Sequence, residues 1–352
     1  MKLLINIGHP SHVHLFKNMI NCLEKKGHII KIVTRDKDVT LKLLDAYGFE
    51  YEVMSGYYNT MLGKIYDFVK TDFKLLKIAI KSKPDILIAV GDPYVAHVGK
   101  LIGRPSLVFT DTEHAELANK LTFPFATIIC TPSCYKGNLG SKHIMLDGYK
   151  ELAYLHPNYF KPDPSILDDL GLSKNDKFII MRFVSWGASH DIGDKGFTNK
   201  KEVLRSLEQY GRVLITSEKK LPSYIEKYKI NVPPEKIHHV LYFADLYIGE
   251  SAPMATESAI LGTPAIFVST SRRGYTDELE SKYGLVYNFS GLKKRQKYAL
   301  EKASELLENE NIKKEWRKKR RKMLSEKIDV TKFMVSLIEN YPESLCDLQS
   351  RG

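Results

Sequence analysis

Short runs of apolar residues alternate with amphipathic stretches along the chain. Apolar runs bounded by turn residues predict buried strands, whereas apolar residues at i, i+3, i+4 and i+7 predict helices. An alternation of the two is typical of βα units, which build parallel sheets. The pattern therefore predicts an α/β protein.

The first half is predicted to form one parallel sheet with its connecting helices. Leu15–Lys26 has apolar residues at helical spacing and is followed by Gly27, a C-terminal stop signal. A longer apolar stripe predicts a helix over about Met61–Lys81. The expected strands are Leu3–Ile7, Ile29–Thr34, Tyr51–Val53, Asp85–Val90, Ser106–Thr110 and Thr127–Cys130.

Three prolines and the absence of a clean period between Gly148 and Pro164 predict a connection between two domains. A second αβ series follows, and three helical stretches complete the chain from Lys293 on, the last of them Val330–Asn340. The expected strands of this half are Phe178–Phe183, Val213–Thr216, Ile237–Val240, Leu246–Gly249, Ala265–Val268 and Leu285–Tyr287. Its expected helices lie near Lys200–Tyr210, Pro222–Lys229, Met254–Leu261 and Thr276–Tyr283.

Two Rossmann-like parallel-sheet domains, residues 1–160 and 161–329, are therefore expected to face each other across a cleft. Residues 330–352 are expected to form a helix and tail that pack back on the N-terminal domain. Open α/β sheets bind their ligands at the carboxyl ends of the strands. The chemistry is therefore expected in that cleft.

The composition fits a folded protein of two domains. The chain has 352 residues, of which 43% are hydrophobic and 27% charged. Its four cysteines lie scattered without C-x-x-C pairs, which argues against a zinc site or a disulfide framework. No apolar run is long enough to span a bilayer, and the opening KLLINIG is too short for a signal peptide. A cytoplasmic location is the expectation.

The net charge of +11 is concentrated in one segment. Lys313–Lys327 carries nine basic and two acidic residues and reads as one helix. A solvated helix face is the preferred interpretation. Peripheral contact with the inner membrane face is the second, because anionic lipids attract basic clusters. Nucleic acid is the least favoured partner, since no recognition motif accompanies the charge.

Residues 249–269 read GESAPMATESAILGTPAIFVS, an apolar strand followed by a small-residue turn and a helix. Backbone N–H groups at the helix start, around Pro253–Ala255, are expected to be unpaired donors suited to a diphosphate. Glu257, one turn further on, is expected to accept hydrogen bonds from ribose hydroxyls. The alternative is a structural strand–turn–helix with a solvated Glu257.

The first expected strand is followed by a turn that contains three histidines, GHPSHVH. Either His12 or His14 is a candidate for removing a proton from an acceptor hydroxyl, because imidazole titrates near neutrality. Helix capping by Ser11 with solvent-exposed rings is the structural alternative. Metal binding is less favoured, because no carboxylate or cysteine is paired with these histidines in the sequence.

Carboxylates follow two neighbouring strands of the first half. Asp92 follows Asp85–Val90, and Asp111 and Glu113 follow the next strand. Carboxylates brought together at one sheet edge can separate their pKa values, so that one serves as base and another as acid. Capping of the next helix by Asp92 and Asp111 is the alternative.

A comparable loop follows the first strand of the second half. Arg182 is a candidate for neutralising a diphosphate, and His190 for acting on the sugar or the leaving group. A buried ion pair and a capping Asp191 explain these residues equally well.

The run PMATESAILGTPAIFVS resembles the sugar-nucleotide signature of GT-B enzymes. Among these enzymes it resembles notably the lipid II-type N-acetylglucosaminyltransferases and the non-hydrolysing UDP-N-acetylglucosamine 2-epimerases. The resemblance implies that Glu257 holds the ribose and that Met254, Ala255 and Thr256 lie under the diphosphate. Where those families have a glycine pair, this chain has Glu250 followed by Ser251, Ala252 and Pro253.

Other segments extend the resemblance. The opening run with Gly8 resembles the glycine-and-histidine start of GT-B transferases. In the epimerases, carboxylates at the positions of Asp92 and Glu113 act at the sugar carbons, and the segment of Arg272 and Arg273 lies near the substrate phosphate. Similarity over about residues 1–294 is strongest to a mainly archaeal GT-B-like family of undefined activity, through FTDTEHAELANKLTFP, DGYKELAYLHP and MRFVSWGASHD.

The preferred hypothesis is a glycosyltransferase that uses a nucleotide sugar, most consistently UDP-linked, in surface or lipid-linked glycan synthesis. The C-terminal domain would bind the donor, and the N-terminal domain would carry the acceptor and the catalytic groups. No metal or cofactor is implied. An epimerase that uses Asp92 and Glu113 is the alternative, and a nucleotide-sugar or polyanion binding protein without turnover is a third.

Overall fold

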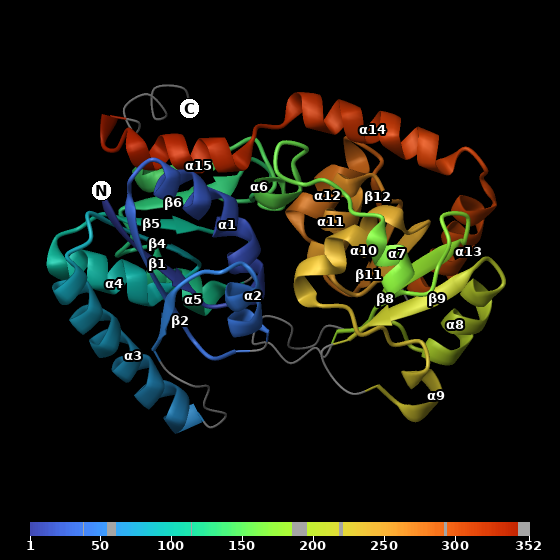
Figure 1. Ribbon diagram of the computed structural model, residues 1–352, viewed down its shortest axis with the longest axis horizontal. Helices are drawn as coiled ribbons and strands as arrows, with labels where there is room; N and C mark the ends of the chain where they lie inside the picture. The colour runs from blue at the N-terminus through green and yellow to red at the C-terminus, as the bar shows by residue number, and fades with distance from the viewer. Residues whose placement is uncertain are drawn as a thin grey trace. The chain divides into compact units, whose positions relative to one another are not determined.

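The computed structural model describes residues 1–37, 39–54, 61–113, 115–184, 196–217, 221–291 and 294–343, with only the backbone for 61–65. The chain divides into two compact units (Figure 1). Unit 1 comprises Met1–Tyr154 and Ile328–Gly352, and unit 2 comprises Leu155–Lys327. Each is an α/β unit around one parallel sheet, as the alternating pattern predicts.

Unit 1 is built on a parallel sheet in the order β3-β2-β1-β4-β5-β6-β7. Its strands are β1 (Lys2–Ile7), β2 (Ile29–Thr34), β3 (Tyr51–Val53), β4 (Ile86–Val90), β5 (Ser106–Phe109), β6 (Ile128–Pro132) and β7 (His143–Leu146). The edge strand β7 was not expected from the sequence. It alternates between buried Ile144 and exposed Met145, so it lacks the continuous apolar run that marks the central strands.

Two helical layers cover the sheet of unit 1. One contains α1 (Pro10–Lys25), α2 (Thr40–Ala46) and α15 (Val330–Glu339), and the other contains α3 (Met61–Ser82), α4 (Pro93–Ile102) and α5 (Glu116–Thr122). The chain runs outward from β1 to β3 and then crosses to β4, and this reversal of direction places the two groups on opposite faces. Short helical segments η1 (Gly140–Lys142) and α6 (Leu152–Leu155) follow.

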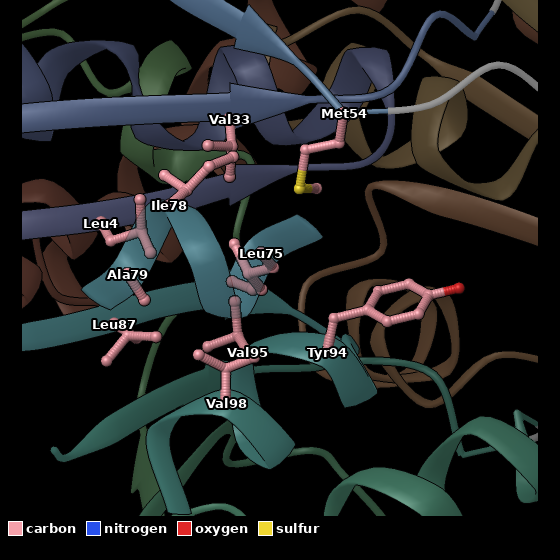
Figure 2. Packing of buried hydrophobic residues seen from close by; sticks show 11 residues of the cluster. Leu4, Val33, Met54, Leu75, Ile78, Ala79, Leu87, Tyr94, Val95 and Val98 are labelled. Atoms are coloured by element: carbon pink, nitrogen blue, oxygen red, sulfur yellow. The ribbon is translucent and has the colours of Figure 1, made fainter. Parts of the chain in front are cut away.

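The core under α3 shows how this layer is held (Figure 2). Leu75 and Ala79 of α3 pack with Leu4 and Leu87 of the central strands and with Val95 of α4. All five side chains are fully buried. Burial of each larger apolar side chain contributes about 1.5–3 kcal/mol, so one face of α3 is fixed on the sheet and the other is left outward.

Unit 2 has a parallel sheet in the order β12-β11-β10-β8-β9. Its strands are β8 (Phe178–Arg182), β9 (Arg212–Thr216), β10 (Leu246–Gly249), β11 (Ala265–Ser269) and β12 (Val286–Ser290). Its helices are α7 (Ser165–Asp169), α8 (Lys200–Glu208), α9 (Ser223–Glu226), η2 (Pro234–Lys236), α10 (Ile237–Phe243), α11 (Ala252–Leu261), α12 (Gly274–Ser281), α13 (Arg295–Glu308) and α14 (Ile312–Glu326).

One expected strand is wrong. Ile237–Val240 belongs to helix α10, which packs against α11. The run IHHVLYF is short and apolar, and periodicity alone does not separate a short buried helix from a buried strand. The η2 turn (Pro234–Lys236), preceded by Pro233, leads directly into this helix.

The basic helix α14 is anchored on unit 2 by its apolar side. Trp316 is 1% exposed, and its indole N–H donates to the carbonyl of Leu285 at 3.1 Å. Lys319 donates to the carbonyl of Gly284, and Arg320 to that of Ile260. Part of the positive charge of this helix therefore caps carbonyl groups of neighbouring elements.

The C-terminal helix α15 belongs to unit 1, where it packs on α1. Thr331 donates its hydroxyl to the carbonyl of Ala153 at 2.8 Å, and Met334 and Ile338 are fully buried. No helix in the described ranges combines the length and the hydropathy that a bilayer span requires.

Candidate functional site

A small cavity of about 30 Å³ lies at the carboxyl ends of the strands of unit 1, and most of the side chains that line it are apolar. The ends of β4, β5, β6 and β7 line it, together with Asp111 and Lys150. Lys150 donates to Asp111 Oδ2 at 2.6 Å, and Thr112 donates to the other carboxylate oxygen. Asp111 is therefore paired with a cation and is not the helix cap that was one alternative, because α5 begins only at Glu116.

Lys150 was missed by the sequence analysis, although it lies in the quoted segment DGYKELAYLHP. The stretch from Gly148 to Pro164, which contains Lys150, was interpreted as a connection between domains because of its three prolines. The chain does pass from unit 1 to unit 2 after Tyr154, but Lys150 still belongs to unit 1. It lines the cavity at the sheet edge, and its positive charge contributes to lowering the pKa of His12. No local pattern marks Lys150, because its partner Asp111 is far away in the sequence.

The histidine turn after β1 is organised by His9. His9 is the N-cap of α1, and its Nδ1 accepts from the N–H of Ser11 at 3.2 Å. Capping by Ser11 is therefore wrong. Gly8 precedes this cap without a steric requirement for glycine, because a Cβ there would meet nothing within 4 Å.

His12 and His14 lie in different surroundings. His14 is 7% exposed, and its ring contacts Tyr47 and Tyr154 in the body of unit 1. His12 lies on the first turn of α1, and its Nδ1 is buried without a hydrogen-bond partner among the described residues. Burial and the positive charges of His9 and Lys150 hold the pKa of His12 well below its usual value.

Asp92 sits at the end of β4 and caps α4. Its Oδ1 accepts from the N–H of Val95 at 3.0 Å, and its Oδ2 accepts from Nδ2 of Asn6 at 2.7 Å. Capping, the structural alternative, is thus confirmed for Asp92. Burial nevertheless raises the pKa of this carboxyl to about 6, against the opposing effect of the bond to Val95. Asn6 is a further site residue that the sequence did not reveal, because it lies inside an apolar strand.

Glu113 has one carboxylate oxygen bound and one buried. Its Oε1 accepts from the N–H of Lys136 at 3.2 Å, whereas Oε2 has no partner among the described residues. Asp92 and Glu113 both follow strands of the same sheet, at its carboxyl edge. Unit 1 therefore offers the carboxyl groups of Asp92 and Glu113 at one sheet edge, and burial shifts the pKa of Asp92 and of His12.

In unit 2, the helix start after β10 differs from the expectation in its hydrogen bonds. Ser251 is the N-cap of α11. The N–H of Met254 donates to Ser251 Oγ at 3.4 Å and that of Ala255 to Ser251 O at 3.0 Å, and proline has no N–H. The prediction of unpaired donors at Pro253–Ala255 is therefore wrong, since the cap itself engages them.

Glu257 is buried rather than solvated. It is 8% exposed, and its Oε1 lies 3.1 Å from Nε2 of His238, which is 2% exposed. His238 comes from α10, the helix that was expected to be a strand, so the sequence analysis did not find this partner. The solvated-glutamate alternative is wrong, and the carboxylate is held in one orientation.

The other residues around the start of α11 face different neighbours. Thr256 is fully buried and donates its hydroxyl to the carbonyl of Ala252 inside the helix. Ala255 is also fully buried, and Met254 is half-buried, with its sulfur 3.9 Å from Thr216 Oγ1.

Glu250, which stands where related motifs have glycine, binds backbone N–H groups at both ends of the β8–α8 connection. It is 4% exposed, and its carboxylate accepts from the N–H of Val184 at 2.9 Å and from that of Phe197 at 2.8 Å. The two bonds hold the ends of the β8–α8 connection together. His190 lies in that connection, outside the described residues.

Charged side chains surround Tyr247 at this edge of unit 2. Arg182, Glu250 and Glu257 all influence the proton of its hydroxyl, which donates to the carbonyl of Ser251 at 3.0 Å. Burial is the main cause that raises the pKa of Tyr247 above its usual value. Arg182 therefore lies in the same neighbourhood as Glu257.

The arginine pair after β11 is engaged at the start of α12. Arg272 pairs with Asp277 at 2.9 Å, and Arg273 donates to Ser271 Oγ at 2.6 Å.

No cluster of three or more His, Cys, Asp or Glu side chains that could hold a metal occurs within the described part of the chain.

Comparison with known proteins adds the family. Residues 1–343 match the family described as "Protein of unknown function (DUF354)". The chain belongs to this family. An uncharacterized protein of Methanocaldococcus jannaschii, MJ0665, is 28% identical over 273 residues, which are 74% of this chain and 80% of the relative.

Solved structures share the fold at low identity. UDP-N-acetylglucosamine 2-epimerase of Neisseria meningitidis, bound to UDP-GlcNAc, has a TM-score of 0.67 at 13% identity over 97% of this chain and 100% of that one. MnaA of S. aureus, in complex with UDP, has a TM-score of 0.69 at 15% identity over 97% of both chains. The spinosyn rhamnosyltransferase SpnG with thymidine diphosphate has a TM-score of 0.61 at 13% identity over 96% of this chain and 100% of that one. The fold is that of GT-B transferases and these epimerases.

Proposed function

We propose that this family member is a glycosyltransferase that uses a nucleotide sugar, with UDP as the nucleotide, to build surface or lipid-linked glycans. The observation that carries the proposal is Glu257, a buried carboxylate on the first turns of α11 whose Oε1 is oriented by His238. A fixed acceptor of this kind behind β10 suits the two hydroxyls of a ribose. Structures with the same fold contain UDP-GlcNAc or UDP.

In this proposal unit 2 binds the donor. Arg182 supplies positive charge near Glu257. Since the cap occupies the N–H groups of Met254 and Ala255, charge on the diphosphate would be met by the dipole of α11 and by arginine side chains, with Arg272 and Arg273 as further candidates. Gly8, Ser251, Ala252 and Pro253 remain candidate contacts to the donor.

Unit 1 would supply the base. An acceptor hydroxyl attacks the anomeric carbon, the bond from that carbon to the diphosphate oxygen breaks, and UDP leaves. His12 would accept the proton of the hydroxyl, and its lowered pKa keeps the ring neutral at pH 7, as a base requires. His14 is the weaker candidate, because its ring is packed between tyrosines.

The second candidate function, sugar-nucleotide epimerisation, is favoured by Asp92. A carboxyl with a pKa of about 6 can take or release a proton near neutrality. Glu113 would provide a second carboxyl group on the same sheet. Incubation with UDP-N-acetylglucosamine alone separates the two reactions. A 2-epimerase forms the manno isomer, detected by NMR, whereas a transferase releases UDP only when an acceptor is added.

The donor proposal is tested by calorimetry after a thermal-shift panel of UDP-, dTDP- and GDP-sugars. Glu257→Gln keeps the size of the side chain but removes its charge, and we expect the dissociation constant of the best ligand to rise at least tenfold, because charge-assisted bonds to hydroxyls are worth about 1.5–3 kcal/mol. Glu301→Gln, on the exposed side of α13, is the matched control and should bind normally. Absence of any stabilising nucleotide sugar, or unchanged affinity in Glu257→Gln, would overturn the proposal.

A further inference from the structure

The outward side of α3 combines exposed apolar side chains with lysines. Tyr66 and Phe73 are each 62% exposed, Ile80 is 60% exposed and Val69 is 49% exposed. They recur at three- to seven-residue intervals, so they line one side of the helix. The α3 face is defined here as Tyr66, Val69, Lys70, Phe73, Lys77, Ile80 and Lys81, which are all the exposed side chains of α3 from residue 66 on.

Acidic groups are turned away from the α3 face. Asp67 is 3% exposed and forms an ion pair with Arg35, and Asp72 bonds to Nδ1 of His97 at 3.1 Å. The described solvent-facing side of α3 therefore carries only positive charge and apolar surface. The opposite side is fixed in the core of unit 1, so α3 cannot turn to bury the exposed residues without losing that packing (Figure 2).

The apolar surface continues onto the two neighbouring helices. His97 of α4 joins all three helices. Its Nδ1 bonds to Asp72 of α3, and its Nε2 donates to the carbonyl of Leu121 in α5 at 3.0 Å. Phe125 packs edge-on against the same ring and is 42% exposed. Leu101, one turn after His97, is 70% exposed. In Figure 1, α3 lies on the outside of unit 1 beside α4.

The basic helix α14 lacks this combination. Its apolar residues Ile312, Trp316 and Met323 are buried in unit 2, and its exposed residues are charged or polar. An anionic bilayer attracts basic residues, but apolar insertion requires side chains that are free to leave water. The structure thus favours α3 over Lys313–Lys327 as a surface for lipid.

We propose that the α3 face docks unit 1 on an anionic lipid bilayer, with Tyr66, Phe73 and Ile80 entering the interface and the lysines contacting lipid phosphates. Charge complementarity favours lipid over a protein partner. Lysine is depleted in the cores of protein interfaces, whereas helices that lie in a bilayer surface are rich in lysine and aromatic residues. This inference does not depend on the nucleotide-sugar proposal, because vesicle binding is measured without any substrate.

The experiment is sedimentation of the full chain with vesicles. The chain should pellet with vesicles containing phosphatidylglycerol, bind at least tenfold more weakly to pure phosphatidylcholine, and lose binding as salt rises, because salt screens the charge. Tyr66→Ser with Phe73→Ser removes the aromatic contacts, and Lys77→Gln with Lys81→Gln removes charge. Each pair should weaken binding at least tenfold.

Matched controls lie on unit 2. Tyr298→Ser removes an aromatic side chain that is 42% exposed on α13, and Lys318→Gln with Arg321→Gln removes the same charge from α14. Both controls should bind like the unmodified chain, and circular dichroism should show all variants folded. Failure to pellet with anionic vesicles at low salt, normal binding by the α3 variants, or an equal loss in the α14 control would overturn the inference. A dimer in ultracentrifugation that the α3 variants dissociate would also overturn it, since the α3 face would then join two copies.

Discussion

At the scale of single residues, the carboxylates of this protein differ in what holds them. Glu250 accepts two backbone N–H groups, Asp111 is paired with Lys150, and Glu257 lies against His238. Within the described residues, Asp92 has neither a cation nor a histidine in direct contact and is bonded to Asn6 and Val95. These differences explain why burial raises the pKa of Asp92 so clearly.

Asp92 predicts a definite dependence of stability on pH. Its folded-state pKa of about 6 lies above the value near 4 of an unfolded chain. Between those values the folded state binds more protons, so the free energy of unfolding falls as pH rises from about 4 to 6 and is then constant. Asp92→Asn keeps the cap and removes the ionisation, and should stabilise the protein by about 1–3 kcal/mol at pH 7.

Urea denaturation at several pH values measures this effect. The gain of Asp92→Asn should vanish below about pH 3, where the carboxyl is protonated in both states. An equal gain or loss at all pH values would mean that the side chain acts only through its hydrogen bonds.

His12 shows the opposite sign. Because its folded-state pKa is lowered, its contribution is present above the unfolded value near 6.5 and is lost as pH falls below it. We expect the ring to remain neutral at pH 6, which nitrogen-detected NMR of the side chain can measure. A protonated ring at pH 6 would show that burial does not lower the pKa of His12.

At the scale of elements, glycines at strand ends serve different purposes in the two units. A Cβ on Gly249 would come within 2.5 Å of the hydroxyl of Tyr247 and 3.0 Å of the carbonyl of Arg182. Gly8, after β1, has open space at the same position. The close approach of β10 to its neighbour β8 in unit 2 therefore requires glycine at position 249. No comparable contact requires glycine at position 8 in unit 1.

Gly249→Ala should accordingly lower the free energy of unfolding by about 1–3 kcal/mol, because an extra methyl in a packed site forces its neighbours to shift. Gly8→Ala is the matched control, and chemical denaturation should show a change within about 1 kcal/mol. Equal effects of the two substitutions would show that the contact at Tyr247 relaxes without cost.

At the scale of the whole molecule, the chain leaves unit 1 after Tyr154 and returns to it at Ile328. Val330, Met334, Leu337 and Ile338 of α15 are almost fully buried there. Each such side chain contributes about 1.5–3 kcal/mol, and their sum rivals the stability of a typical domain, about 5–15 kcal/mol.

A chain that ends at Lys327 should therefore lose the cooperative unfolding of unit 1 but keep that of unit 2. Both tryptophans, Trp186 and Trp316, fall in the range of unit 2, so tryptophan fluorescence reports on it, while proteolysis maps unit 1. A chain that ends at residue 343 is the control and should resemble the full chain. Joint loss of both transitions in the shorter chain would show that unit 2 needs unit 1 to fold.

The sequence by itself determined the elements and their order. Long periodic stretches such as α1 and α3, the continuous apolar strands and the cap Asp92 are local signals, and a parallel α/β fold follows from their alternation. The motif around Glu257 likewise pointed to a helix start behind a strand. The edge strand β7 was missed, and the short apolar run Ile237–Val240 was assigned to the wrong element.

The tertiary structure decided which partner each functional side chain has. His238 meets Glu257, Lys150 meets Asp111, and Glu250 holds Val184, all across separations that no local pattern encodes. It also decided that Trp316 is buried while Phe73 faces solvent. The physical reason is that helical period shows which residues share a face, whereas packing alone decides which face is covered.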